Sequence, residues 1–137
     1  MPKKTIDLPS VSAIEGLIFP DKFPEITNVN YDLISLEIML LFEWQRQLKI
    51  TFKNVIGFRV LDEGNLLEFW INEVRVPGWL WDVQAGGWFD LEKERGGFVE
   101  GYHDYPERKE YLVIGIDDCV SILTTSEPDF LSLEIDE

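Results

Sequence analysis

The chain has 137 residues, a length suited to one domain, and its 45% hydrophobic content is sufficient for a buried core. The formal net charge is −14 and uneven, because residues 69–137 hold 16 acidic and 5 basic side chains. Such a charge argues against nucleic acid and anionic membranes as partners and favours a basic protein. No apolar run reaches the roughly 20 residues that span a bilayer, and the single cysteine excludes an internal disulfide.

The first thirty residues contain four prolines and little hydrophobic periodicity. They predict an irregular N-terminal arm with short extended pieces over 1–30, followed by an antiparallel β core over 31–137, within a single domain spanning 1–137. The opening MPKKTIDLPS lacks the apolar stretch of a secretory signal peptide. Together with the lone cysteine, this leads us to expect a cytoplasmic protein.

Two segments after the arm, YDLISLEIML (residues 31–40) and QLKITFKN (residues 47–54), alternate with the two-residue period of half-buried strands. The faces that we expect to line the core comprise Ile34, Leu36, Ile38 and Leu40 in the first segment and Leu48, Ile50 and Phe52 in the second. The intervening FEWQRQ predicts a hairpin loop. The next segment, VIGFRVLD, continues the strand pattern.

The stretch DEGNLLEFWINE breaks this rhythm and predicts one short helix. Its apolar side chains, spaced as one helical stripe, are Leu66, Leu67, Trp70 and Ile71. Asp62 or Asn65 is suited to cap its N-terminus.

A glycine- and tryptophan-rich middle, GWLWDVQAGGWFDLEKERGGF, follows over residues 78–98. Alternation places Trp79, Trp81 and Val83 on one strand face, which predicts a core wall or, if the face is exposed, a recognition patch. The glycine pairs around WFDLEKER predict turns, and neither pair matches a phosphate-binding loop. The open question is whether Trp88 and the neighbouring acids face solvent.

The C-terminal third contains three further β segments, EYLVIGID, CVSILTT and FLSLEI, separated by turn-forming residues. We expect them to pair as antiparallel neighbours through short turns. In total the sequence predicts a mainly β protein, or α+β with little helix. Its antiparallel sheet is expected to form a sandwich or half-barrel of about seven to eight strands with one short helix.

No constellation in the chain specifies catalysis, a metal or a cofactor. The only histidine, His103, has Glu100 and Asp104 nearby but lacks the further His or Cys ligands typical of zinc sites. Cys119 lies in an apolar strand beside two aspartates, an environment that raises a thiol pKa and disfavours the thiolate.

Paired carboxylates leave one enzymatic or ligand-binding alternative open. Such pairs are Asp62 with Glu63, Asp117 with Asp118, and Asp82 with Asp90. Two carboxylates across a cleft perform glycoside hydrolysis, and aromatic side chains commonly line sugar sites. The alternative is therefore a small-ligand domain, carbohydrate-binding or hydrolytic, with a pocket lined by Trp79, Trp81 and Trp88.

Three segments, FKNVIGFRVLDEGNLLEFW, the Gly- and Trp-rich middle, and YLVIGIDDCVSILTTSEPDF, together resemble small acidic bacterial proteins. Some of these are uncharacterised and others are immunity proteins that neutralise polymorphic or contact-dependent toxins. The resemblance covers roughly residues 48–130 and consists of turns and core positions. It implies a non-enzymatic chain that occludes a cognate toxin, and it carries over no functional residue.

The leading hypothesis is thus a protein-binding module without catalytic residues, most concretely an immunity protein that complements a basic toxin domain. The contacts that we predict for it are Trp88, Asp82, Asp90, Glu92, Glu94, Asp117, Asp118, Glu127 and Asp129. A third alternative is a structural homodimer formed through an unpaired edge strand.

Overall fold

A computed structural model describes residues 9–70, 75–95 and 107–133. The protein is mainly β, as the sequence predicts, and within the described structure 55% of the residues lie in strands and 14% in helices. Nine strands form two antiparallel sheets. Among the described residues, no helix has the length and apolar character needed to cross a bilayer.

The strands and helices follow one another along the chain with short connections. The strands are β1 (Ser10–Ala13), β2 (Glu25–Tyr31), β3 (Ser35–Phe42), β4 (Arg46–Lys53), β5 (Val55–Asp62), β6 (Leu80–Ala85), β7 (Lys109–Ile114), β8 (Asp118–Thr124) and β9 (Asp129–Leu133). The helices are α1 (Leu67–Trp70) and α2 (Trp88–Arg95), and the 3-10 turns are η1 (Glu43–Gln45) and η2 (Glu63–Asn65).

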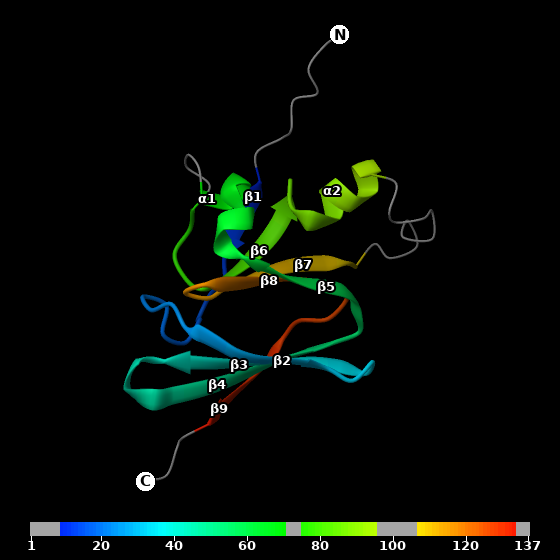
Figure 1. Cartoon of the computed structure of the whole chain (residues 1–137). Helices are drawn as coiled ribbons and strands as arrows, with labels where there is room; N and C mark the ends of the chain where they lie inside the picture. Colours follow the sequence, from blue (N-terminus) through cyan, green and yellow to red (C-terminus); the bar gives the residue numbers. More distant parts are fainter. Residues whose placement is uncertain (1–8, 71–74, 96–106, 134–137) are drawn as a thin grey trace.

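The molecule has three layers. One sheet has the strand order β1-β6-β7-β8-β5 and the other the order β2-β3-β4-β9. Figure 1 shows the four-stranded sheet on one side of the five-stranded sheet, and α1 and α2 on its opposite side. The five-stranded sheet is therefore the central layer and is covered on both faces.

The main core lies between the two sheets. The expected faces of β3 and β4 supply it with Leu36, Ile38, Leu40, Leu48, Ile50 and Phe52, all at most 1% exposed. The five-stranded sheet contributes Leu80, Tyr111, Val113, Val120 and Ile122. The register pairs Leu36 with Phe52 and Ile38 with Ile50 across the predicted hairpin, which confirms its alternation.

A second core lies on the outer face of the five-stranded sheet, under α1. It consists of Leu66, Phe69, Trp81, Val83, Leu112, Ile114 and Cys119. Asp62 Oδ1 accepts a hydrogen bond from the Gly64 N–H at 2.8 Å and caps η2, which leads directly into α1. The predicted helix is present as α1, whereas Asp62, one of the two predicted caps, caps the preceding turn η2. Ile71 lies outside the described residues.

Within the arm expected over 1–30, two extended pieces are strands of the sheets, namely β1 and most of β2. Both strands lie at sheet edges: β1 pairs with β6 and β2 with β3. Most of their side chains are exposed, so their sequences carry little of the alternation that marks a half-buried strand. Backbone pairing, which side-chain periodicity does not report, makes them strands.

The prediction that Ile34 belongs to the core face is wrong, because its side chain is 79% exposed. Asp32 Oδ1 accepts hydrogen bonds from the backbone N–H groups of Ile34 and Ser35, both at 2.8 Å. These bonds close a turn in which Leu33 adopts a φ of 76°. Consequently β3 begins at Ser35, and the two-residue alternation holds only from there.

The C-terminal strands confirm one predicted pairing and contradict another. β7 and β8 form the expected hairpin through the Asp117-Asp118 turn. β9, in contrast, does not pair with β8 but crosses to the other sheet and pairs with β4. The nine strands of the described residues exceed the seven to eight expected, and WFDLEKER forms a second helix, α2. Gly86, with a φ of 73°, fits the turn predicted before it, whereas Gly96 and Gly97 lie outside the described residues.

Candidate functional site

The two tryptophans of the expected core wall are both buried, but they do not share a face. Trp79 is 0% exposed and packs between the sheets, where its Nε1–H donates to the Ile18 carbonyl at 2.9 Å. Trp81 is 1% exposed and belongs to the outer core, where its ring meets Trp70 edge-on at 5.8 Å. Trp79 precedes β6 and follows Gly78, whose φ is 105°, so strand alternation does not apply to it.

Trp88 is half-buried rather than freely exposed. Its ring lies against Gly57 of β5, where an added Cβ would approach the ring to 3.3 Å. The Arg59 guanidinium stacks over the same ring at 5.3 Å. Three cavities in the described part of the chain are lined by other residues, so the geometry does not support a pocket lined by Trp79, Trp81 and Trp88.

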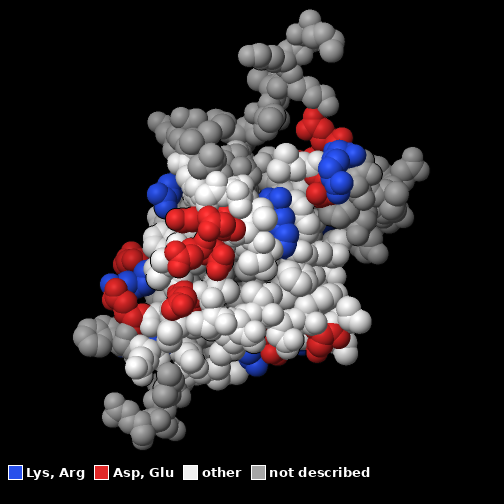
Figure 2. All heavy atoms as spheres, in the orientation of Figure 1, with Lys and Arg blue, Asp and Glu red and all other residues white. Residues whose placement is uncertain are grey.

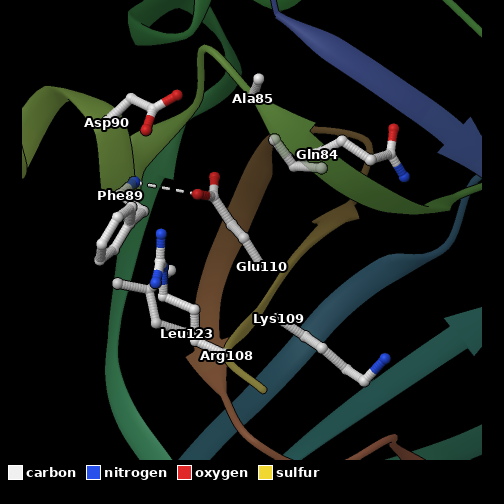
Figure 3. A pocket seen from close by; sticks show the side chains of 9 residues that line it. Gln84, Ala85, Phe89, Asp90, Arg108, Lys109, Glu110 and Leu123 are labelled. Atoms are coloured by element: carbon white, nitrogen blue, oxygen red, sulfur yellow. Dashed lines mark hydrogen bonds between the residues drawn. The ribbon is translucent and has the colours of Figure 1, made fainter. Parts of the chain in front are cut away.

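The N-terminus of α2 holds a carboxylate of the chain itself. Glu110 of β7 is 7% exposed, and its oxygens accept hydrogen bonds from the backbone N–H groups of Trp88 at 2.8 Å and Phe89 at 2.9 Å. Figure 3 shows Glu110 rising from its strand toward the first turn of the helix. The positive end of the helix is thus neutralised internally, and these N–H groups are not open to a phosphate.

Close packing and burial shape the surroundings of Glu110. A Cβ at Gly87 would overlap the Glu110 carboxylate and lie 2.7 Å from Val83 Cγ1, so only glycine fits there. Burial raises the pKa of Glu110, although its two backbone donors and the Arg59 charge oppose the rise. The cavity beside it holds about 170 Å³. Because both carboxylate oxygens are engaged, we assign Glu110 a structural rather than an acid–base role.

The predicted contact residues on α2 also have internal partners. Asp90 Oδ2 accepts from the Gly86 N–H at 2.7 Å, and Glu92 pairs with Arg95 one turn later. The hydrogen bond from Arg95 holds the pKa of Glu92 below its usual range. Glu94 lies on the same short helix and is exposed.

Asp82, Glu127 and Asp129 lie elsewhere. Asp82 of β6 pairs in register with Tyr111, whose pKa rises to about 12 through burial and through the negative charges of Asp82 and Glu127. Asp129 begins β9 on the other sheet, where it pairs with Thr51. The structure therefore distributes the predicted acidic contacts over several places and does not join them into one surface.

Four carboxylates do gather at one edge of the central sheet, and we call Asp62, Glu63, Asp117 and Asp118 the acidic cluster. Asp62 pairs in register with Asp118, and the Glu63 N–H donates to the Asp117 carbonyl at 3.0 Å. All four side chains are exposed, and none belongs to an ion pair among the described residues. Figure 2 shows acidic side chains gathered where β7 and β8 turn below α1.

Backbone hydrogen bonds fix the turn that carries Asp117 and Asp118. The Gly115 N–H donates to the Asp118 carbonyl at 2.9 Å, and the Ile116 N–H donates to the Pro24 carbonyl at 2.9 Å. A Cβ at Gly115 would lie 2.7 Å from the Asp118 carbonyl oxygen, so the backbone approaches too closely for another residue. The turn is thus fixed by its backbone while the side chain of Ile116 remains 54% exposed.

An apolar groove of about 490 Å³ opens beside the acidic cluster. The aromatic and aliphatic side chains on its walls come from three separate segments and belong to Phe23, Trp70, Ile114 and Ile116. Glu63 contributes to both the groove and the cluster, and Arg75 completes the lining with its guanidinium 5.7 Å from the centre of the Trp70 ring. A concave apolar surface with few polar groups is the usual form of a binding site.

The surroundings offer no nucleophile or metal site among the described residues. Cys119 lies buried beneath the acidic cluster, and burial together with Glu63, Asp118 and Asp62 raises the pKa of its thiol to about 11. The described residues include no group of His, Cys, Asp and Glu that would hold a metal ion. The residues considered above as metal ligands, His103, Glu100 and Asp104, lie outside the described residues.

Comparisons of the chain with protein-family models, curated proteins and solved structures give no match. The interpretation of this site therefore depends on its geometry. The sequence predicted Asp117 and Asp118 as contacts, whereas it indicated Asp62 as a helix cap and Asp62 with Glu63 as a pair for acid–base chemistry. It missed Phe23 and Ile116, although an isoleucine directly before two aspartates in a turn is a signal that could have identified the latter.

Proposed function

We propose that the protein binds a basic protein partner through the acidic cluster and the apolar groove beside it. The observation that carries this proposal is the placement of Asp62, Glu63, Asp117 and Asp118. These carboxylates are exposed at one edge of the sheet, on backbone fixed by hydrogen bonds, next to a concave apolar surface. Asp62 also caps η2, whereas the exposed charges of Glu63, Asp117 and Asp118 belong to no ion pair among the described residues and are free to complement a partner.

Electrostatics supports a basic partner in two ways. The net charge of −14 produces a field that accelerates the encounter with a cationic surface. At short range, the four carboxylates provide acceptors for charge-assisted hydrogen bonds from Arg or Lys. Because the cluster is exposed, added salt screens its field and slows association.

The most concrete version is an immunity-type inhibitor that covers a cationic toxin surface, such as a nuclease active site. Nucleases bind a polyanion and therefore present basic side chains, which an acidic cluster neutralises by direct contact. Such an inhibitor requires rigidity and charge rather than catalytic groups. The backbone-bonded Gly115–Asp118 turn and the fully engaged Glu110 carboxylate are consistent with that requirement.

The test measures association kinetics with the partner purified from the native strain. We expect the variant Glu63→Gln/Asp117→Asn/Asp118→Asn to lower the association rate about tenfold or more at low salt and to flatten its salt dependence. The matched control Glu25→Gln/Glu127→Gln/Asp129→Asn removes the same number of exposed charges from other places. A rate that is independent of salt, or an equal loss in both variants, would contradict the proposal.

A further inference from the structure

We infer that the groove receives an apolar side chain of the basic partner, and that this side chain is flanked in the partner's sequence by Lys or Arg. This inference rests on the proposed function and specifies the chemistry of the segment that docks. It commits to one occupant, an exposed basic segment with a single large aliphatic residue. Three features support this occupant: the size of the groove, the carboxylates beside it, and Arg75, whose guanidinium lies over the Trp70 ring.

The groove has the size and walls of a side-chain pocket. Its volume of about 490 Å³ accommodates one large aliphatic side chain with its adjoining backbone. Phe23 and Ile116 remain 45% and 54% exposed on its walls, so both still have apolar surface to bury. Burying a leucine side chain contributes enough free energy to raise an affinity by about tenfold or more.

The charges beside the groove favour basic residues on either side of the partner's apolar residue. Glu63 lies on the groove wall, and the acidic cluster continues from it through Asp117 and Asp118. A residue inserted next to Ile116 therefore has its sequence neighbours close to carboxylates. Lys or Arg at those neighbouring positions gains attraction, whereas Asp or Glu is repelled.

Arg75 places a cation of the chain inside the groove. Its guanidinium lies over the Trp70 ring at 5.7 Å, and its side chain is exposed. A partner cation that approaches the same ring must displace Arg75 and is repelled by it. Arg75 is thus an intramolecular competitor, so its removal should strengthen binding even though it deletes a contact seen in the free protein.

The walls are also positioned before binding. The Ile116 N–H donates to the Pro24 carbonyl, which links the Ile116 wall to the segment that carries Phe23. On the opposite wall, the Trp70 Nε1–H donates to the Glu63 carbonyl at 2.7 Å. Because these bonds hold both walls in the free protein, binding costs little ordering entropy.

The experiment titrates the isotope-labelled full chain with two blocked synthetic peptides, Lys-Arg-Leu-Arg-Lys and Lys-Arg-Ser-Arg-Lys, and follows backbone and indole NMR shifts. The peptides carry equal charge, so their difference reports the apolar side chain alone. We expect the leucine peptide to bind about tenfold more tightly and to shift the signals of Gly64, Gly115 and the Trp70 indole.

Two variants, each with a control variant on α2, test whether the peptide occupies the groove. Ile116→Ser should reduce the affinity for the leucine peptide to nearly that for the serine peptide, whereas Leu91→Ser, an exposed apolar position on α2, should leave it unchanged. Arg75→Gln should strengthen peptide binding about threefold, whereas Lys93→Gln on α2 should have a smaller effect.

The possible failures separate the two proposals. Equal affinities for the two peptides, shifts that map outside the groove, or no binding of either peptide would overturn the inference about the groove. If association with the purified partner still depends on the acidic cluster in any of these cases, binding of a basic partner through that cluster stands, and the groove is removed from the interface. If the partner binds the cluster variant as well as wild type, the proposed function fails.

Discussion

Two acid-rich regions of the molecule use their carboxylates in opposite ways. Around α2, Glu110 accepts from two backbone N–H groups, Asp90 accepts from the Gly86 N–H, and Glu92 pairs with Arg95. In the acidic cluster, by contrast, Asp62 is the one carboxylate that accepts a hydrogen bond within the described residues, from the Gly64 N–H. In the first region the carboxylates accept hydrogen bonds or form ion pairs within the fold, whereas the second region presents its carboxylates to solvent.

This difference shows why a count of acidic residues does not locate a binding surface. The stretch WFDLEKER has three acids in eight residues, yet Asp90 accepts from Gly86 just before the helix and Glu92 pairs with Arg95 within it. The acidic cluster draws its four acids from two separate segments that only the β5–β8 pairing brings together. An acid is available for a partner when the fold does not already require it.

The largest expected effect that separates the two regions is on stability. Glu110→Ala leaves the Trp88 and Phe89 N–H groups without their acceptor and creates a void beside Val83, so the free energy of unfolding should fall by about 3 kcal/mol. Urea denaturation measures this change. The exposed carboxylate Glu127 serves as the control, and Glu127→Ala should change the same quantity by less than about 0.5 kcal/mol. Equal effects would mean that Glu110 does not hold α2.

The pH dependence of stability provides the second distinction. Because burial raises the native pKa of Glu110 above 4.5, the native state binds more protons than the unfolded state between 4.5 and that raised value. The contribution of Glu110 to stability is therefore greatest below 4.5 and declines as pH rises through the native pKa. Denaturation of wild type and Glu110→Gln from about pH 4 to about pH 8 should show wild type losing stability relative to the variant. A difference that is constant or grows with pH would refute this.

The smallest expected effect belongs to the acidic cluster. In Glu63→Gln/Asp117→Asn/Asp118→Asn, the free energy of unfolding should stay within about 0.5 kcal/mol of wild type or rise slightly, because repulsion among neighbouring carboxylates decreases. Urea denaturation at low salt is the measurement, and high salt should remove any gain. A loss above about 1 kcal/mol would show that these side chains support the fold after all.

Local sequence patterns predicted the parts of the fold where one face of a strand is buried. The alternation in β3 and β4 gave the correct core residues from Leu36 to Phe52, because side chains on successive residues point to opposite faces. The hairpin turn at Asp117-Asp118 was predicted from its residue types, and the cap by Asp62 from its position before an apolar stripe. Each of these features is decided within about ten residues of chain.

Local patterns failed where a distant segment decides the outcome. Nothing near Phe130 indicates that β9 leaves β8 and pairs with β4. The helix α2 buries only Phe89 among its eight residues, so it has almost no apolar stripe to recognise. Its N-terminus is satisfied by Glu110, twenty-one positions beyond Phe89, and such a partner is invisible to short-range spacing.

The amino-acid sequence by itself determined a mainly β protein with a large negative charge and the identity of most core side chains. These properties follow from composition and from the two-residue period of strands. Only the tertiary structure decided that Trp79 and Trp81 serve different cores, that Glu110 binds α2, and that Asp62 and Glu63 join Asp117 and Asp118 beside a groove. The physical reason is that register and sheet order determine which distant side chains meet, and many residues contribute weakly to both.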